Sequence, residues 1–188
     1  MKTLCQKVSR KVSAFSRVAP YIDEKKGKIL YHTFIMSNFN YCPLVWMFCG
    51  KTQNKEIDRV HKRALRILLE DYTSSFDELL QKIDDTRVHV KNLRNLMVEI
   101  YKCLSCENPS FMWNIFQQKE LAYNLRSGSL LMLPRAKTTT YGTSSLTFRG
   151  SILWNSLPDT IKSSPSVVCF KRSIKKWKGE NCTCKNCC

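Results

Sequence analysis

Glycine and proline are scarce in this chain, which has only six of each among its 188 residues. Folds built from many short strands need these residues at their tight turns, so their scarcity argues against a turn-rich all-β fold. Acidic residues are also few, since 15 Asp and Glu stand against 31 Lys and Arg and leave a formal net charge of +16. This excess favours a polyanionic partner, because each phosphate that a cation neutralises releases condensed counterions. Solubility or an acidic membrane surface are the two alternatives that charge alone leaves open.

Long apolar runs are missing as well. The most apolar stretch, Ile29 to Cys49, is interrupted by His32, Asn38 and Asn40, whereas a bilayer-spanning helix needs roughly 20 predominantly apolar residues. The first residues, Met1 to Lys7, carry no apolar run behind their charges, so we expect no signal peptide and no membrane partner. Ten cysteines without an export signal indicate a reducing compartment, nuclear or cytoplasmic.

Apolar residues recur at helical spacing along most of the chain, which predicts a mainly α fold. We expect a helical bundle over residues 1–72 and a C-terminal helical region over 73–180. The latter contains an irregular basic loop at 123–143, followed by two closing helices, and a Cys-rich tail covers 181–188. The expected helices are Thr3–Val18, Asp23–Phe39, Thr52–Leu69, Ser75–Ile83, Arg87–Leu104, Ser144–Leu157 and Pro165–Trp177. Tyr41–Phe48 is apolar on every side, which predicts full burial.

The clearest amphipathic helix is the one expected at Thr52–Leu69. Its apolar stripe contains Ile57, Val60, Ala64 and Leu68. The opposite face carries five cations and no carboxylate, at Lys55, Arg59, Lys62, Arg63 and Arg66. Because like charges at this spacing repel one another, an isolated helix gains nothing from the arrangement. A phosphate backbone would relieve the repulsion, so we predict that this face binds nucleic acid. The alternative is an ordinary solvated surface.

Two further groups of cations are predicted to help bind nucleic acid. Arg126, Arg135 and Lys137 lie among serines and threonines in the irregular loop, and cations with hydroxyls suit phosphate contacts. The same composition also describes any exposed loop. Lys171 and Lys175 belong to the basic side of the last expected helix, whose apolar side includes Phe170 and Ile174.

Cysteines gather at the end of the sequence, at Cys182, Cys184, Cys187 and Cys188. The spacing Cys184-x-x-Cys187 is that of a zinc knuckle, and the neighbouring lysine would favour thiolates. Four thiolates this close in sequence would struggle to surround one ion, although Cys103-x-x-Cys106 has the spacing to complete a site. Zinc is therefore the one candidate metal, and a frayed, oxidation-prone tail is the alternative.

Four stretches, in order along the chain, resemble the region that follows the palm in non-LTR retrotransposon reverse transcriptases of the jockey and chicken-repeat type. They are YHTFIMSNFNYCPLVWMF from Tyr31, IDRVHKRALRILL from Ile57, YNLRSGSLLMLPRAKTTTYG from Tyr123, and Gly150–Trp177 with its Leu-Trp-Asn-x-Leu-Pro motif. The resemblance covers nearly the whole chain, and the succession of stretches is more specific than any one of them. It implies that residues up to about Leu69 form a thumb, which grips template–primer by its backbone.

The resemblance also implies what the chain should lack. In this family, aspartates in an aromatic-x-Asp-Asp hairpin hold the divalent metal ions that carry out in-line attack. The pair Asp84-Asp85 follows an expected helix, and Lys82 stands where the aromatic residue should be. We therefore expect no catalytic centre here, a palm upstream of Met1, and Mg²⁺ only through that palm.

The leading hypothesis is thus a nucleic-acid-binding fragment of an RNA-directed DNA polymerase, which is no enzyme by itself. Its expected partners are RNA, DNA or an RNA–DNA hybrid, together with the palm domain. The sequence leaves open two alternatives: a zinc-clipped structural or interaction protein, and a decayed, non-functional remnant of a retroelement.

Overall fold

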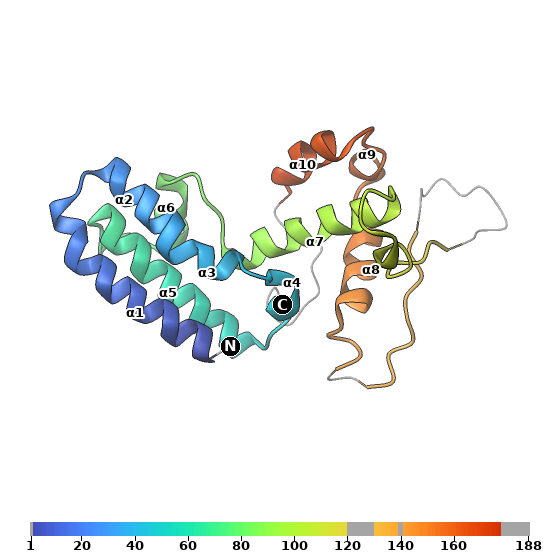
Figure 1. Cartoon of the computed structure of the whole chain (residues 1–188), viewed down its shortest axis with the longest axis horizontal. Coiled ribbons are helices and arrows are strands. Elements are labelled where there is room, and N and C mark those ends of the chain that lie inside the picture. Colours follow the sequence, from blue (N-terminus) through green and yellow to red (C-terminus); the bar gives the residue numbers. More distant parts are fainter. Residues whose placement is uncertain (1, 120–129, 139–140, 178–188) are drawn as a thin grey trace. The chain divides into compact units, whose positions relative to one another are not determined.

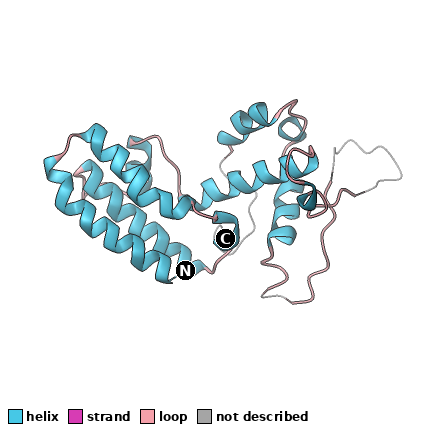
Figure 2. Cartoon of the chain, viewed as in Figure 1, coloured by secondary structure: helices cyan, strands magenta, loops and turns pink. Residues whose placement is uncertain are grey.

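The structure is a computed structural model that describes residues 2–119, 130–138 and 141–177. It is mainly helical, as predicted, and its described residues contain no β-strand beyond one isolated antiparallel bridge, between Gln118 and Leu131 (Figure 2). The chain divides into two compact units, Met1–Lys91 and Asn92–Cys188. The division falls about twenty residues beyond the position expected from the sequence, because the segment that follows residue 72 packs with the first unit.

The first unit is a bundle of helices around one apolar core (Figure 1). Its two long helices, α1 (Lys2–Val18) and α5 (Lys51–Leu69), lie side by side, and the segment that contains α2 (Glu24–Leu30) and α3 (Ser37–Asn40) runs back alongside them. Val12 and Phe15 from α1 share the core with Ala64 from α5 and with Ile35 and Phe39. The elements are α1 (Lys2–Val18), a 3₁₀ turn (Ala19–Tyr21), α2 (Glu24–Leu30), a π-helix (Tyr31–Met36), α3 (Ser37–Asn40), α4 (Pro43–Trp46), α5 (Lys51–Leu69) and α6 (Phe76–Lys82).

Capping side chains set where two of these helices begin. Asp23 accepts a hydrogen bond of 2.9 Å from the backbone N–H of Lys26 and starts α2. Ser75 starts α6 with a capping box, in which the Ser75 hydroxyl accepts from the backbone N–H of Glu78 while the Glu78 carboxylate accepts from the backbone N–H of Ser75. Both boundaries therefore follow from short-range hydrogen bonding.

The second expected helix, Asp23–Phe39, is helical throughout but changes its winding at Tyr31–Met36, where the chain forms a π-helix between α2 and α3. Gly27 lets this segment approach α5 closely, because a Cβ at that position would lie only 3.1 Å from Cδ1 of Leu68. The wider π winding places Tyr31 and Ile35 in the core, and both are fully buried.

The prediction that Tyr41–Phe48 is fully buried is wrong. Only Met47 is fully buried, whereas the Tyr41 side chain is 77% exposed and that of Val45 is 87% exposed. The physical reason is the shortness of α4, which has four residues and cannot bring all of its sides against one core. Cys42 enters it in the left-handed conformation, at φ 43°, so the chain turns sharply there.

The second unit contains α7 (Val88–Leu104), which begins in the first unit, a 3₁₀ turn (Ser110–Met112), α8 (Leu146–Ser156), α9 (Asp159–Lys162) and α10 (Val167–Lys175). Its core is aromatic: the ring of Phe170 stacks on Tyr101 at 4.5 Å and on Trp154 at 5.9 Å between centroids. The sequence did not predict α9. It also placed the start of α10 too early, since Ser166 caps this helix.

None of the helices in the described ranges combines the length and the apolar composition that a bilayer crossing requires.

Candidate nucleic-acid interface

Four of the five cations predicted on the basic face of α5 line one hollow in the first unit. Arg59, Lys62, Arg63 and Arg66 surround a cavity of about 440 Å³, which we call the α5 groove. The remaining lining comes from Ser16, Ile67 and Tyr72. The fifth cation, Lys55, is exposed one turn earlier on α5 and does not line the groove.

The groove follows from how α5 packs. Its apolar stripe is buried as predicted, with Ile57 and Ala64 against the core, so the cations must face outward. Neighbouring α1 contributes Ser16 to the lining, and the Arg63 guanidinium donates to the hydroxyl of Ser13 on the same helix at 3.3 Å. Within the described residues, the Nε of Arg66 is buried and has no hydrogen-bond acceptor.

The positive charge of the α5 groove is not neutralised by the surrounding protein. Within the described ranges, none of its four cations forms an ion pair. Asp71, next to Tyr72 in sequence, is already engaged: the Lys82 ammonium and hydrogen bonds from Ser74 lower the pKa of this carboxyl well below its usual range. Asp58 on the same helix lies 3.6 Å from Arg87 instead.

A second basic hollow lies in the second unit, between α7 and α10. We call this cavity of about 330 Å³ the α7–α10 groove; its cations are Arg94, Lys102, Lys171 and Lys175, and its other lining residues are Asn95, Val98, Glu99 and Ile174. Lys171 and Lys175 were predicted from the sequence, whereas Arg94 and Lys102 were missed. Their spacing of eight residues on one helix, which places both on one face, was the pattern that could have indicated them.

The other predicted cations are not gathered into either groove. Arg135 and Lys137 are exposed on the irregular segment before α8, and Arg126 falls outside the described residues. The loop therefore offers exposed cations but no described hollow that joins them to α5 or α10.

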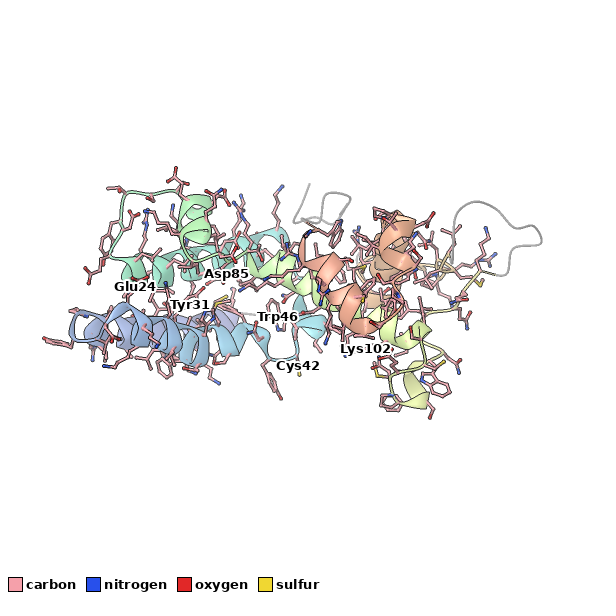
Figure 3. All side chains as sticks on the ribbon, turned by 90° about the horizontal axis from the view of Figure 1, so that it is seen from above. Glu24, Tyr31, Cys42, Trp46, Asp85 and Lys102 are labelled. Atoms are coloured by element: carbon pink, nitrogen blue, oxygen red, sulfur yellow. The ribbon has the colours of Figure 1, made fainter. Side chains whose placement is uncertain are left out.

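A buried polar pair stabilises the helix that carries the α5 groove. The Tyr31 hydroxyl and the Nε2 of His61 lie 2.5 Å apart in the core, and the phenol of Tyr31 points between the helices (Figure 3). Burial lowers the pKa of His61 to about 3, with a smaller contribution from Lys91, and burial raises that of Tyr31. His61 thus has a packing role in the core of the first unit.

The pair Asp84-Asp85 lies in a turn after α6, as predicted. Asp84 is exposed with a left-handed backbone at φ 52°, and Asp85 forms an ion pair of 2.6 Å with Lys91. Among the residues that the structure describes, neither carboxylate belongs to a group that could hold a metal ion.

No group of three or more His, Cys, Asp or Glu with metal-binding geometry occurs in the part of the chain that the structure describes. Cys103 is buried, and its Sγ accepts from the side-chain amide of Asn108 at 3.4 Å, while Cys106 is exposed. The four cysteines proposed as zinc ligands, Cys182, Cys184, Cys187 and Cys188, lie outside the described residues.

The described residues therefore form two basic grooves, one in each unit. Comparisons with protein-family models, with curated protein sequences and with solved structures found no match to this chain.

Proposed function

We propose that this chain binds nucleic acid through the α5 groove, by contacts to the phosphate backbone. The observation that carries the proposal is the gathering of Arg59, Lys62, Arg63 and Arg66 in one hollow without a compensating carboxylate. A protein that only needed solubility would gain nothing from concentrating like charges there. A polyanion offsets their repulsion and releases counterions when it binds.

The geometry of α5 suits a charged backbone rather than the edges of bases. Arg59 and Arg66 are seven residues apart on one uninterrupted helix, about 10 Å along its axis. Double-stranded DNA carries one charge per roughly 1.7 Å of its axis, so several phosphates fall within this distance. Guanidinium groups bind phosphate oxygens in a bidentate manner, which positions a duplex without selecting its sequence.

The resemblance to non-LTR retrotransposon reverse transcriptases gives this binding a biological setting. In the proposal, the first unit grips an RNA–DNA hybrid or another duplex, and the chain itself transfers no nucleotide. Any Mg²⁺-dependent polymerisation would need a palm domain from elsewhere. The proposal sets this function in a reducing compartment, nuclear or cytoplasmic, which ten cysteines without an export signal favour.

Reversing the four groove cations tests the proposal. We expect Arg59→Glu, Lys62→Glu, Arg63→Glu and Arg66→Glu together to abolish binding of a fluorescein-labelled RNA–DNA hybrid, measured by fluorescence anisotropy at several salt concentrations. The helical content, measured by circular dichroism, should persist, because these side chains face away from the core.

A control variant with the same change in net charge separates the groove from the charge of the whole chain. It reverses four exposed cations that line neither groove: Lys7, Lys25, Arg172 and Lys176. We expect this control to weaken binding only modestly, through long-range attraction. Unchanged affinity in the groove variant, or an equal loss in the control, would contradict the proposed interface.

A further inference from the structure

The second unit contains a third hollow, at the end of α7, that is neither of the basic grooves. Its volume is about 860 Å³, and its lining comes from the end of α7, the residues directly after the following 3₁₀ turn and the segments around the Gln118–Leu131 bridge. Figure 3 marks Lys102 on α7, directly before the residues that build this hollow. We call it the Trp113 hollow; it is lined by Cys103, Leu104, Cys106, Trp113, Asn114, Phe116, Gln117, Gln118, Lys119 and Met132.

One wall of the Trp113 hollow is the indole ring of Trp113, which is hydrogen-bonded at its nitrogen and exposed to solvent. After α7 the chain changes direction at Cys106, whose backbone is left-handed at φ 54°. The indole N–H of Trp113 then donates to the carbonyl oxygen of Asn108 at 2.6 Å, and the side chain remains 42% exposed. An aromatic ring fixed by its polar edge loses little further freedom when a planar ligand stacks on its face.

A second wall of the hollow, which contains Gln117, Gln118, Lys119 and Met132, is braced by hydrogen bonds. The N–H of Met132 donates to Gln117 at 2.8 Å, and the N–H of Lys119 donates to Leu130 at 2.7 Å. The side-chain amide of Asn155 in α8 then donates to the Leu131 carbonyl at 3.0 Å and accepts from its N–H at 2.8 Å. Asn155, from the Leu-Trp-Asn-x-Leu-Pro motif, thus acts as a substitute strand partner that holds this wall.

The side chains that line the Trp113 hollow suit a nucleobase. Asn114, Gln117 and Gln118 each provide amide donors and acceptors, the same pair of groups that the edges of unpaired bases present. Lys119 supplies a positive charge, and the lining residues that the structure describes include no carboxylate that would repel phosphate. An exposed aromatic face beside amides and a cation is the combination that single-strand-binding proteins use.

We propose that the Trp113 hollow binds an unpaired nucleotide of a single-stranded segment, with its base stacked on Trp113 and its edge hydrogen-bonded to the amides. The inference rests on the proposed function, because it takes the bound polymer to be nucleic acid. It adds a second mode of recognition: the α5 groove binds phosphates, while this hollow binds the base itself.

The test compares two single strands that differ only in their bases. One is a short labelled oligodeoxyadenylate, and the other is an abasic strand of the same length and charge. The intact chain should bind the first about tenfold more tightly, a factor typical of one stacked base. Trp113→Ala should remove that preference, and Trp113→Phe, which keeps an aromatic face, should retain most of it.

Phe111→Ala is the matched control, because Phe111 is 78% exposed on the same segment and does not line the hollow. It should leave the preference unchanged. If Trp113→Ala lowers the helical content, the double variant Gln117→Ala with Gln118→Ala replaces it in the test, since both of these side chains are exposed.

Three outcomes would overturn the inference. Equal binding of both strands by the intact chain would show that charge alone acts, or that the hollow serves a protein partner. If Phe111→Ala lowered the preference for the strand with bases as much as Trp113→Ala does, the base would not stack on Trp113 specifically. If the hybrid and both strands fail to bind, the proposed function fails together with this inference, whereas salt-dependent binding of the hybrid with no base preference overturns this inference alone.

Discussion

The two basic grooves have similar cations but use them differently. In the α5 groove, all four cations come from one helix and none is ion-paired among the described residues. In the α7–α10 groove they come from two helices, and part of their charge is already engaged. Lys102 lies 2.7 Å from Glu99, and Arg94 donates to the backbone carbonyl of Trp177 at 2.8 Å. The first groove is therefore better suited to bind phosphate, while the second also holds its own unit together.

The cores of the two units also differ. The first encloses a polar pair, Tyr31 and His61, whereas the second is built on the stacked rings of Tyr101, Phe170 and Trp154. All three histidines of the chain lie in the first unit. Changes in packing should therefore affect the second unit most, and changes in pH should affect the first.

The largest expected effect is that of removing the ring at the centre of the second unit. Phe170 is fully buried, so Phe170→Ala should lower the free energy of unfolding of this unit by about 3–5 kcal/mol. Hydrogen exchange should show lost protection in α8 and α10, with α1 and α5 unaffected. Phe39→Ala, at an equally buried position in the first unit, should give the opposite pattern. Equal losses in both units from either change would show that the units unfold together.

The second prediction concerns pH and the first unit. Burial holds the pKa of His61 at about 3, against about 6.5 in the unfolded chain, so protonation stabilises only the unfolded state between these values. Stability is thus unaffected above pH 6.5 and falls as the pH drops toward 3. The loss between pH 7 and pH 5 should be about 2 kcal/mol.

The control for this pH dependence is His61→Gln, which can still hydrogen-bond to Tyr31 but does not titrate. Denaturant unfolding at a series of pH values should show a shallower dependence in this variant than in the unaltered chain. Asp85 and Lys91, the charged groups that act on His61, are retained in both, so they do not account for a difference. Parallel pH profiles would show that His61 is not held neutral by burial.

Features that depend on nearby residues were predictable from the sequence. The basic face of α5 follows from helical spacing, and four of its five cations do line one hollow. The capping box of Ser75 and Glu78 likewise needs only three residues of separation. In both cases the interacting groups lie on one helix, so a periodic pattern is enough to place them.

Features that depend on distant segments were not predictable in this way. The pairing of Tyr31 with His61 joins residues thirty positions apart, and the contact of Asn155 with Leu131 joins residues twenty-four apart. Full burial was predicted for Tyr41–Phe48 because composition shows how apolar a segment is, but not how much neighbouring surface exists to cover it. Of the cations in the α7–α10 groove, only those on α10 were predicted. The two on α7 were missed because the groove brings together helices that are far apart in the sequence.

The smallest expected effect sharpens the comparison of the grooves. Glu99 is the only carboxylate that lines the α7–α10 groove in the described structure, and it engages Lys102. A phosphate must compete with the Glu99 carboxylate for Lys102, and Glu99→Gln removes that competitor. The affinity for the RNA–DNA hybrid should therefore rise about twofold to threefold at low salt, consistent with the modest strength of a partly exposed ion pair. The gain in affinity should vanish at high salt, where screening acts.

Glu107→Gln is the control, because it makes the same charge change at an exposed position outside the groove and should have a smaller effect. If the two variants behave alike, the second groove does not contact nucleic acid, and its cations serve chiefly to hold α7 and α10 together.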